Sequence, residues 1–162
     1  MLLRPLLVAM MLALAAPALA AVQARPAAPT ESVWKPADTP PGGVAWSVLE
    51  STKEITRTGK DGYIYSKPAF PPAVQALKGK TVKVSGYMMP LQNGETQTHF
   101  VLLAYPPDCP FHLNPAPTQF IEVKTGKPIR FGYGVVTVQG TLQLLGEDEG
   151  GVFYRIYDGR PS

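Results

Sequence analysis

Apolar and polar residues alternate along residues 80–91, with Val82 and Val84 separated by polar side chains. This two-residue period is typical of a strand with one buried face. Asn93-Gly94 follows, and because both residues tolerate positive φ, the pair is typical of the type I′ turn of a β-hairpin. The next segment, THFVLLAY at 98–105, is denser in apolar residues, so we expect a return strand that is covered on both faces.

The position of this turn predicts which residues face each other across the hairpin. With Asn93-Gly94 at the centre, Met88 faces His99 and Val84 faces Leu103. Directly opposed side chains lie about 5 Å apart. We therefore expect Met88 and His99 to form a cross-strand pair near the turn.

Three further segments alternate like strands, and two segments before the hairpin have the spacing of short helices. The expected strands span 119–124, 134–145 and 152–157, and the expected helices span 44–55 and 71–77. Turns are expected at Thr125-Gly126 and at 146–151, and residues 63–65 are expected to be extended.

These five strands predict a mainly β fold. Gly86 and Gly140 lie in the interiors of two strands, where glycine marks a bend or bulge. Five bent strands with one long connection fit a small coiled barrel of the OB type, preceded by one or two short helices.

The first 43 residues lack the pattern of a packed domain. Residues 1–20 have a positive start, an apolar stretch and a small-residue cleavage site after Ala20, which is typical of a signal peptide. Residues 21–43 are rich in proline and alanine and predict a disordered leader. The barrel domain is thus expected over 44–162, in a periplasmic protein that does not span the membrane after cleavage.

Charge and cysteine content narrow the function classes. The formal net charge is only +3, too small to drive nucleic-acid binding by phosphate neutralisation. The chain has one cysteine, so an intramolecular disulfide, a four-cysteine zinc ribbon and a Cys-x-x-Cys-His haem site are excluded. That cysteine is a buried apolar residue, a ligand or a reactive thiol.

Cys109 and His112 lie three positions apart in the proline-rich loop PPDCPFHLNPAP. A thiolate and an imidazole at this spacing can chelate Zn²⁺ or Cu⁺, and prolines lower the entropy lost when two ligands converge. The alternative is a Cys109 that packs as a small apolar residue and a solvated His112.

Two protein ligands leave a tetrahedral site incomplete. Asp108, His99 and Met88 are the candidates to complete it, along with Met89, water or a second chain. His99 and Met88 could join only if the loop folded back by about 20 Å along the hairpin. The simpler interpretation makes Met88 a core residue and His99 a hydrogen-bonded strand residue.

Two other groups of residues suggest chemistry. A hydrolase or thiol transferase would use Cys109, His112 and Asp108, but such triads are assembled from separate segments of a chain, so we expect no enzymatic activity. The acidic residues 147–149 lack the spacing of a cation-binding loop and are expected to be a solvated hairpin tip.

The words SGYMMPL and FVLLAYPPDCPFHLNPAPTQFIEV resemble an exported bacterial family, domain of unknown function 3299. The matching positions are Gly86, Tyr87, Met88, Pro90, Leu91, Leu102, Leu103, Cys109, His112, Pro115, Pro117 and Gln119. Two residues separate Cys109 from His112 where the family has one, and Thr118 stands in place of an Asn. The resemblance implies an OB-like exported protein. Because members look to be encoded beside transporter components, it also implies a transporter or another envelope protein as partner.

These observations lead to one functional expectation and one alternative. The protein is expected to be a non-enzymatic periplasmic binding or accessory protein that handles Zn or Cu through the Cys109/His112 loop. The alternative is a metal-free adaptor that binds a peptide, a glycan or a membrane-protein partner through the same loop.

Overall fold

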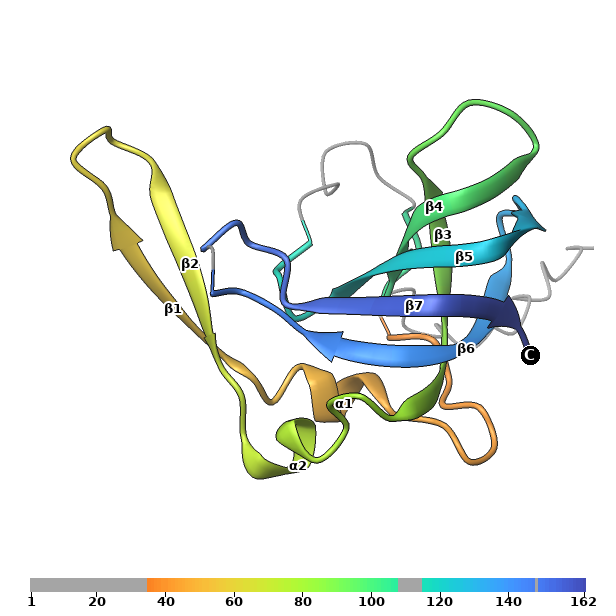
Figure 1. The fold of residues 1–162 in the computed structure, drawn as a ribbon, viewed down its shortest axis with the longest axis horizontal. Helices are drawn as coiled ribbons and strands as arrows, with labels where there is room; N and C mark the ends of the chain where they lie inside the picture. Colours follow the sequence, from red (N-terminus) through yellow and green to blue (C-terminus); the bar gives the residue numbers. More distant parts are fainter. Residues whose placement is uncertain (1–34, 108–114, 148) are drawn as a thin grey trace, which may run out of the picture. The chain divides into compact units, whose positions relative to one another are not determined.

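Five strands close into a barrel in which every strand pairs with two neighbours (Figure 1). The computed structural model describes residues 35–107, 115–147 and 149–162. The barrel strands are β3 (Thr81–Pro90), β4 (Thr96–Leu103), β5 (Phe120–Arg130), β6 (Val135–Leu144) and β7 (Tyr154–Pro161). Their order is β3-β4-β5-β7-β6, and β3 pairs with β6 to close the barrel. Only the β5–β7 pairing within it is parallel, which is the OB arrangement and confirms the expected fold class.

Gly86 and Gly140 are the places where the barrel bends, as the sequence predicts. β3 pairs with β6 up to Tyr87 and with β4 from Tyr87 onward, so Gly86 lies at the change of partner. A Cβ atom on Gly86 would come 2.6 Å from the carbonyl oxygen of Leu103. At Gly140 the register between β6 and β7 shifts, which marks a bulge.

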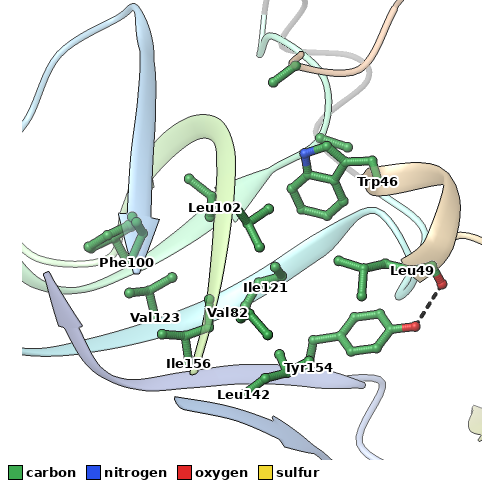
Figure 2. Close-up of a cluster of buried hydrophobic side chains, with 14 of the residues drawn as sticks. Trp46, Leu49, Val82, Phe100, Leu102, Ile121, Val123, Leu142, Tyr154 and Ile156 are labelled. Carbon is green, nitrogen blue, oxygen red and sulfur yellow. Dashed lines mark hydrogen bonds between the residues drawn. The ribbon is translucent and has the colours of Figure 1, made fainter. Parts of the chain in front are cut away.

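The inward-facing side chains of the strands fill the barrel, and α1 (Trp46–Leu49) closes one end of it (Figure 2). Trp46 is buried and its indole Nε1 donates to the carbonyl oxygen of Ser85 at 2.7 Å. Met88 is also part of this core. On β4, residues 100–103 are all buried, which confirms that this strand is covered on both faces.

The register predicted for the hairpin is wrong by three residues. Met88 lies opposite Leu102, and Tyr87 opposite Leu103. The buried side chain of Gln97 explains the difference: its amide oxygen accepts from the backbone N–H of Gln92 at 3.0 Å, and its nitrogen donates back to the Gln92 carbonyl at 2.9 Å. These bonds replace backbone pairing and make the loop wider than a two-residue turn.

The segment before the barrel differs from the expected long helix. α1 ends at Leu49, and residues Lys53–Thr58 form β1, which pairs antiparallel with β2 (Ile64–Ala69). The β-branched residues in β1 favour a strand once β2 is there to pair with it. The second helix is confirmed as α2 (Pro72–Gln75), with proline in its first turn.

The turn expected at Thr125-Gly126 is also wrong. β5 runs through both residues to Arg130, and a register shift with β7 between Val123 and Thr125 takes the place of a turn. The strand continues because β4 also pairs with the far end of β5, where Thr96 lies opposite Arg130.

The last part of the expected leader lies against the barrel. Ala37 is buried, and its backbone N–H donates to the carbonyl oxygen of Ala104 at 2.8 Å. The N–H of Val44 donates to the carbonyl of Lys83 at 2.8 Å. A domain boundary at residue 44 is therefore too late in the chain. The expected signal peptide and residues 21–34 lie outside the described residues. Within the described ranges, no helix is long and apolar enough to cross a membrane.

Candidate functional site

The long connection between β4 and β5 carries the chemistry that the sequence singles out. Asp108, Cys109 and His112 lie outside the described residues. Both ends of the connection are described, up to Pro107 and from Pro115 onward. The geometry of the site is therefore built from these two ends and from the elements that hold them.

Glu50, which caps the C-terminus of α1, joins the two ends of the connection. Its Oε1 accepts a hydrogen bond from Tyr105 Oη at 3.1 Å and another from Gln119 Nε2 at 3.3 Å. Tyr105 lies just before the connection and Gln119 at its end. One carboxylate thus holds together two residues that are fourteen positions apart.

Gln119 strengthens this clamp with its other groups. Its Oε1 accepts from the backbone N–H of Ala116 at 3.2 Å, and its carbonyl oxygen accepts from the N–H of Ala104 at 2.9 Å. Burial, and then the hydrogen bond to Glu50, raises the pKa of the Tyr105 phenol. The phenol therefore stays a neutral donor to Glu50 at physiological pH.

Met88 and His99 are not brought together, so the predicted cross-strand pair is wrong. Met88 points into the core. His99 lies on the outer face of β4, beside buried Phe100 whose side chain points inward. His99 Nε2 is 2.7 Å from Glu122 Oε1, which agrees with the simpler interpretation of a hydrogen-bonded strand residue.

His99 belongs to a polar network on the outer face of β4, β5 and β7. Arg155 donates from Nε to Glu122 Oε2, and its Nη1 donates to Tyr157 Oη at 3.2 Å. Lys124 Nζ lies 3.9 Å from Glu122 Oε1. Burial would raise the pKa of the Glu122 carboxyl, but the hydrogen bonds from His99 and Arg155 outweigh it and lower that pKa.

The acidic turn between β6 and β7 is not simply a solvated tip. Glu149 accepts a hydrogen bond from Arg57 Nε at 3.2 Å and forms an ion pair with the same guanidinium. The hydrogen bond from Arg57 lowers the pKa of the Glu149 carboxyl. This pair ties the turn to β1, and Ser66 on β2 forms an isolated bridge with Gly150.

Among the described residues, no group of three His, Cys, Asp or Glu side chains is arranged to hold a metal ion. Sequence reasoning missed Glu50, Glu122 and Arg155. The last two carried a signal, since each is a charged residue between two inward-facing apolar residues of a strand. Glu50 carried none, because its role depends on the packing of α1 beneath the barrel.

The fold and the clamped connection define a small OB-like barrel protein with one long loop between its second and third barrel strands. A family model described as "Protein of unknown function (DUF3299)" matches residues 31–156. The chain belongs to this family, as its motifs in the hairpin and loop predict.

Other comparisons add a structural relative. A crystal structure of a DUF3299 family protein from Pseudomonas aeruginosa PAO1 is 29% identical in sequence, with a TM-score of 0.46. The match covers 56% of this chain and 66% of that one. No curated protein matches the sequence.

Proposed function

We propose that this protein is an exported, non-enzymatic binding protein of the periplasm, and that the loop between Tyr105 and Gln119 carries its ligand site. The observation that carries this proposal is the clamp made by Glu50 on both ends of the loop. Ordering a loop costs about 1–2 kcal/mol of backbone entropy per residue. Ends that are already joined reduce the part of this cost that ligand binding has to meet.

The ligand we propose is a transition metal ion, Zn²⁺ or Cu⁺. Cys109 and His112 would supply a thiolate and an imidazole, and Asp108 a carboxylate. This donor set suits a borderline or soft cation. Met88 and His99 are left out of the proposed site, since Met88 is in the core and His99 is bonded to Glu122.

Export and the partner are proposed on sequence grounds. The pattern of residues 1–20 supports a cleaved signal peptide. The family resemblance supports a transporter or another envelope protein as the partner that receives or delivers the metal.

The test is a metal titration of the full chain, purified under reducing conditions without a metal-binding tag. Cys109→Ser and His112→Ala should each weaken binding of Zn²⁺ or Cu⁺ while the thermal unfolding temperature stays unchanged. Because both ligands bind deprotonated, affinity should fall as the pH drops through the titration range of histidine. Unchanged titrations of the Cys109→Ser protein would reject the metal proposal and leave a metal-free adaptor as the function of the loop.

A further inference from the structure

The polar network on the outer barrel face, which we term the ring, joins five side chains from three neighbouring strands. Glu122, Lys124, Tyr157 and Arg155 contact one another in a closed circuit, and His99 is attached to this circuit through Glu122. His99 lies across from Lys124, and Glu122 across from Arg155, in the register of the sheet. Tyr157 is the fifth member. The centroid of its aromatic side chain lies 5.9 Å from Lys124 Nζ and 5.7 Å from Arg155 Cζ. The ring joins residues up to 58 positions apart in the sequence and shares no residue with the clamp at the loop ends.

Glu122 is the internal counter-ion of this ring. Its side chain is only 13% exposed, and both carboxylate oxygens accept hydrogen bonds, one from His99 and the other from Arg155. A carboxylate used in this way has little capacity left for a ligand. It instead holds the cations and the tyrosine in fixed positions.

Lys124 and Tyr157, on the outward side of the ring, each have a hydrogen that is available to donate to a ligand. The contact of Lys124 Nζ with Glu122 is 3.9 Å long, beyond hydrogen-bond distance. Lys124 Nζ makes no hydrogen bond within the described part of the chain, and its side chain is 42% exposed. Tyr157 Oη accepts from Arg155, so its own hydrogen is free to donate. One carboxylate against Lys124 and Arg155 leaves the ring with a net positive charge.

We propose that this ring is a binding site for an acidic oligosaccharide, with Lys124 and Tyr157 donating to an anionic group of a sugar unit. OB barrels use the face of their second and third strands, here β4 and β5, for oligosaccharides and oligonucleotides. Nucleic acid is disfavoured at this face, since one net positive charge neutralises few phosphates and single-strand binding needs several stacking aromatics where the ring has one.

The ligand is recognised by charge and by hydroxyl geometry together. Lys124 supplies a charge-assisted hydrogen bond to a carboxylate or sulfate, which is stronger than a neutral one. Tyr157 and the remaining N–H groups of Arg155 reach neighbouring hydroxyl groups. A neutral sugar would lack the charged contact, and a free anion would lack the hydroxyl contacts.

The test uses the full chain titrated with tetragalacturonate and with a sulfated heparin tetrasaccharide, followed by calorimetry and amide chemical shifts. At least one of them should bind, with shift changes centred on His99, Lys124 and Tyr157. Loss of one charge-assisted hydrogen bond should weaken binding about tenfold in Lys124→Gln, and Tyr157→Phe should weaken it severalfold. Lys83→Gln, on the outer side of β3, is the matched control and should bind within twofold of the natural chain.

Several results would overturn the proposal. One is that neither acidic probe binds at millimolar concentration. Another is that neutral maltotetraose, inorganic phosphate or oligothymidylate binds as tightly as the acidic tetrasaccharides. The last is that Lys83→Gln and Lys124→Gln lose the same affinity for the acidic probe. Thermal unfolding of each variant shows that it is folded, which is expected because Lys124 and Tyr157 are outward residues. Cys109→Ser should leave this binding unchanged, so the ring and the metal loop stand or fall separately.

Discussion

Tyr154 Oη lies 2.7 Å from the carbonyl oxygen of Leu49 (Figure 2). It also lies 2.6 Å from Thr52 Oγ1. The side chain of Tyr154 is fully buried, and it joins the start of β7 to the end of α1, 105 positions away in the sequence. Burial raises the pKa of this phenol to about 12. The closing strand of the barrel and the helix beneath it are thus fastened by one neutral tyrosine.

Replacing Tyr154 with phenylalanine should lower the free energy of unfolding by about 1–3 kcal/mol, because buried polar partners are left without the hydroxyl. The phenol ionises near pH 10 in the unfolded chain and near pH 12 in the fold. Its contribution to stability is therefore present below about pH 10 and is lost as the pH rises towards 12.

Urea unfolding at a series of alkaline pH values measures this effect. The natural chain should lose stability more steeply than Tyr154→Phe as the pH rises. Tyr63→Phe, at a residue that is 71% exposed, is the control and should keep the natural slope. Identical slopes in all three proteins would show that Tyr154 is not held neutral by the fold.

Gly86→Ala should destabilise the barrel by about 1–3 kcal/mol, the usual cost of overpacking. The added Cβ would come 2.6 Å from the Leu103 carbonyl oxygen and 2.7 Å from Leu102 Cγ. Gly126→Ala on β5 is the matched control, since no atom lies within 4 Å of its added Cβ. Denaturant unfolding measures the free energy of unfolding of both variants. An equal decrease in the two would mean that the close approach of β4 to Gly86 does not require a glycine.

Glu50→Ala should loosen the loop clamp and cost about 1–3 kcal/mol, because Tyr105 and Gln119 both lose their shared acceptor. The pKa of Tyr105 should fall, which a tyrosine-selective NMR titration can follow. Glu95→Ala, at an exposed residue whose side chain lies 3.4 Å from Arg130, is the control. If the clamp helps to order the loop, Glu50→Ala should also bind the metal more weakly than Glu95→Ala does.

A chain that begins at residue 44 should unfold at lower denaturant concentration than one that begins at residue 35. The shorter chain lacks the backbone hydrogen bond from Ala37 to Ala104 and the burial of the Ala37 side chain. The expected difference is about 1 kcal/mol for the hydrogen bond. A chain that begins at residue 21 should match the one that begins at residue 35, and it serves as the reference. If all three unfold together, residues 35–43 contribute nothing to the fold.

Sequence reasoning succeeded where the evidence was local. The alternation around Val82 and Val84 located β3, and both valines are buried. Glycine in the interior of a strand correctly predicted the corner at Gly86 and the bulge at Gly140. Strand number and glycine placement together were enough to predict the OB-like barrel, since few architectures accommodate five bent strands.

The same reasoning failed for residues whose neighbours come from other strands. Asn93-Gly94 favoured a tight turn, but the buried Gln97 side chain bonds to Gln92 and widens the loop. Thr125-Gly126 looked like a turn, but pairing with β4 and β7 carries β5 through it. In both cases a nonlocal partner outweighed a local preference, as is common for β-structure.

The sequence alone therefore determined the fold class, the strand-bending glycines, the family and the loop that holds the cysteine, because each depends on residue type and on order along one segment. Only the tertiary structure decided the neighbours: Met88 in the core, His99 on Glu122, and Glu50 across the two ends of the loop. A shift of three residues in one hairpin separates Met88 from His99. Such a register depends on side-chain hydrogen bonds and on closure of the whole barrel, which no single segment of the chain specifies.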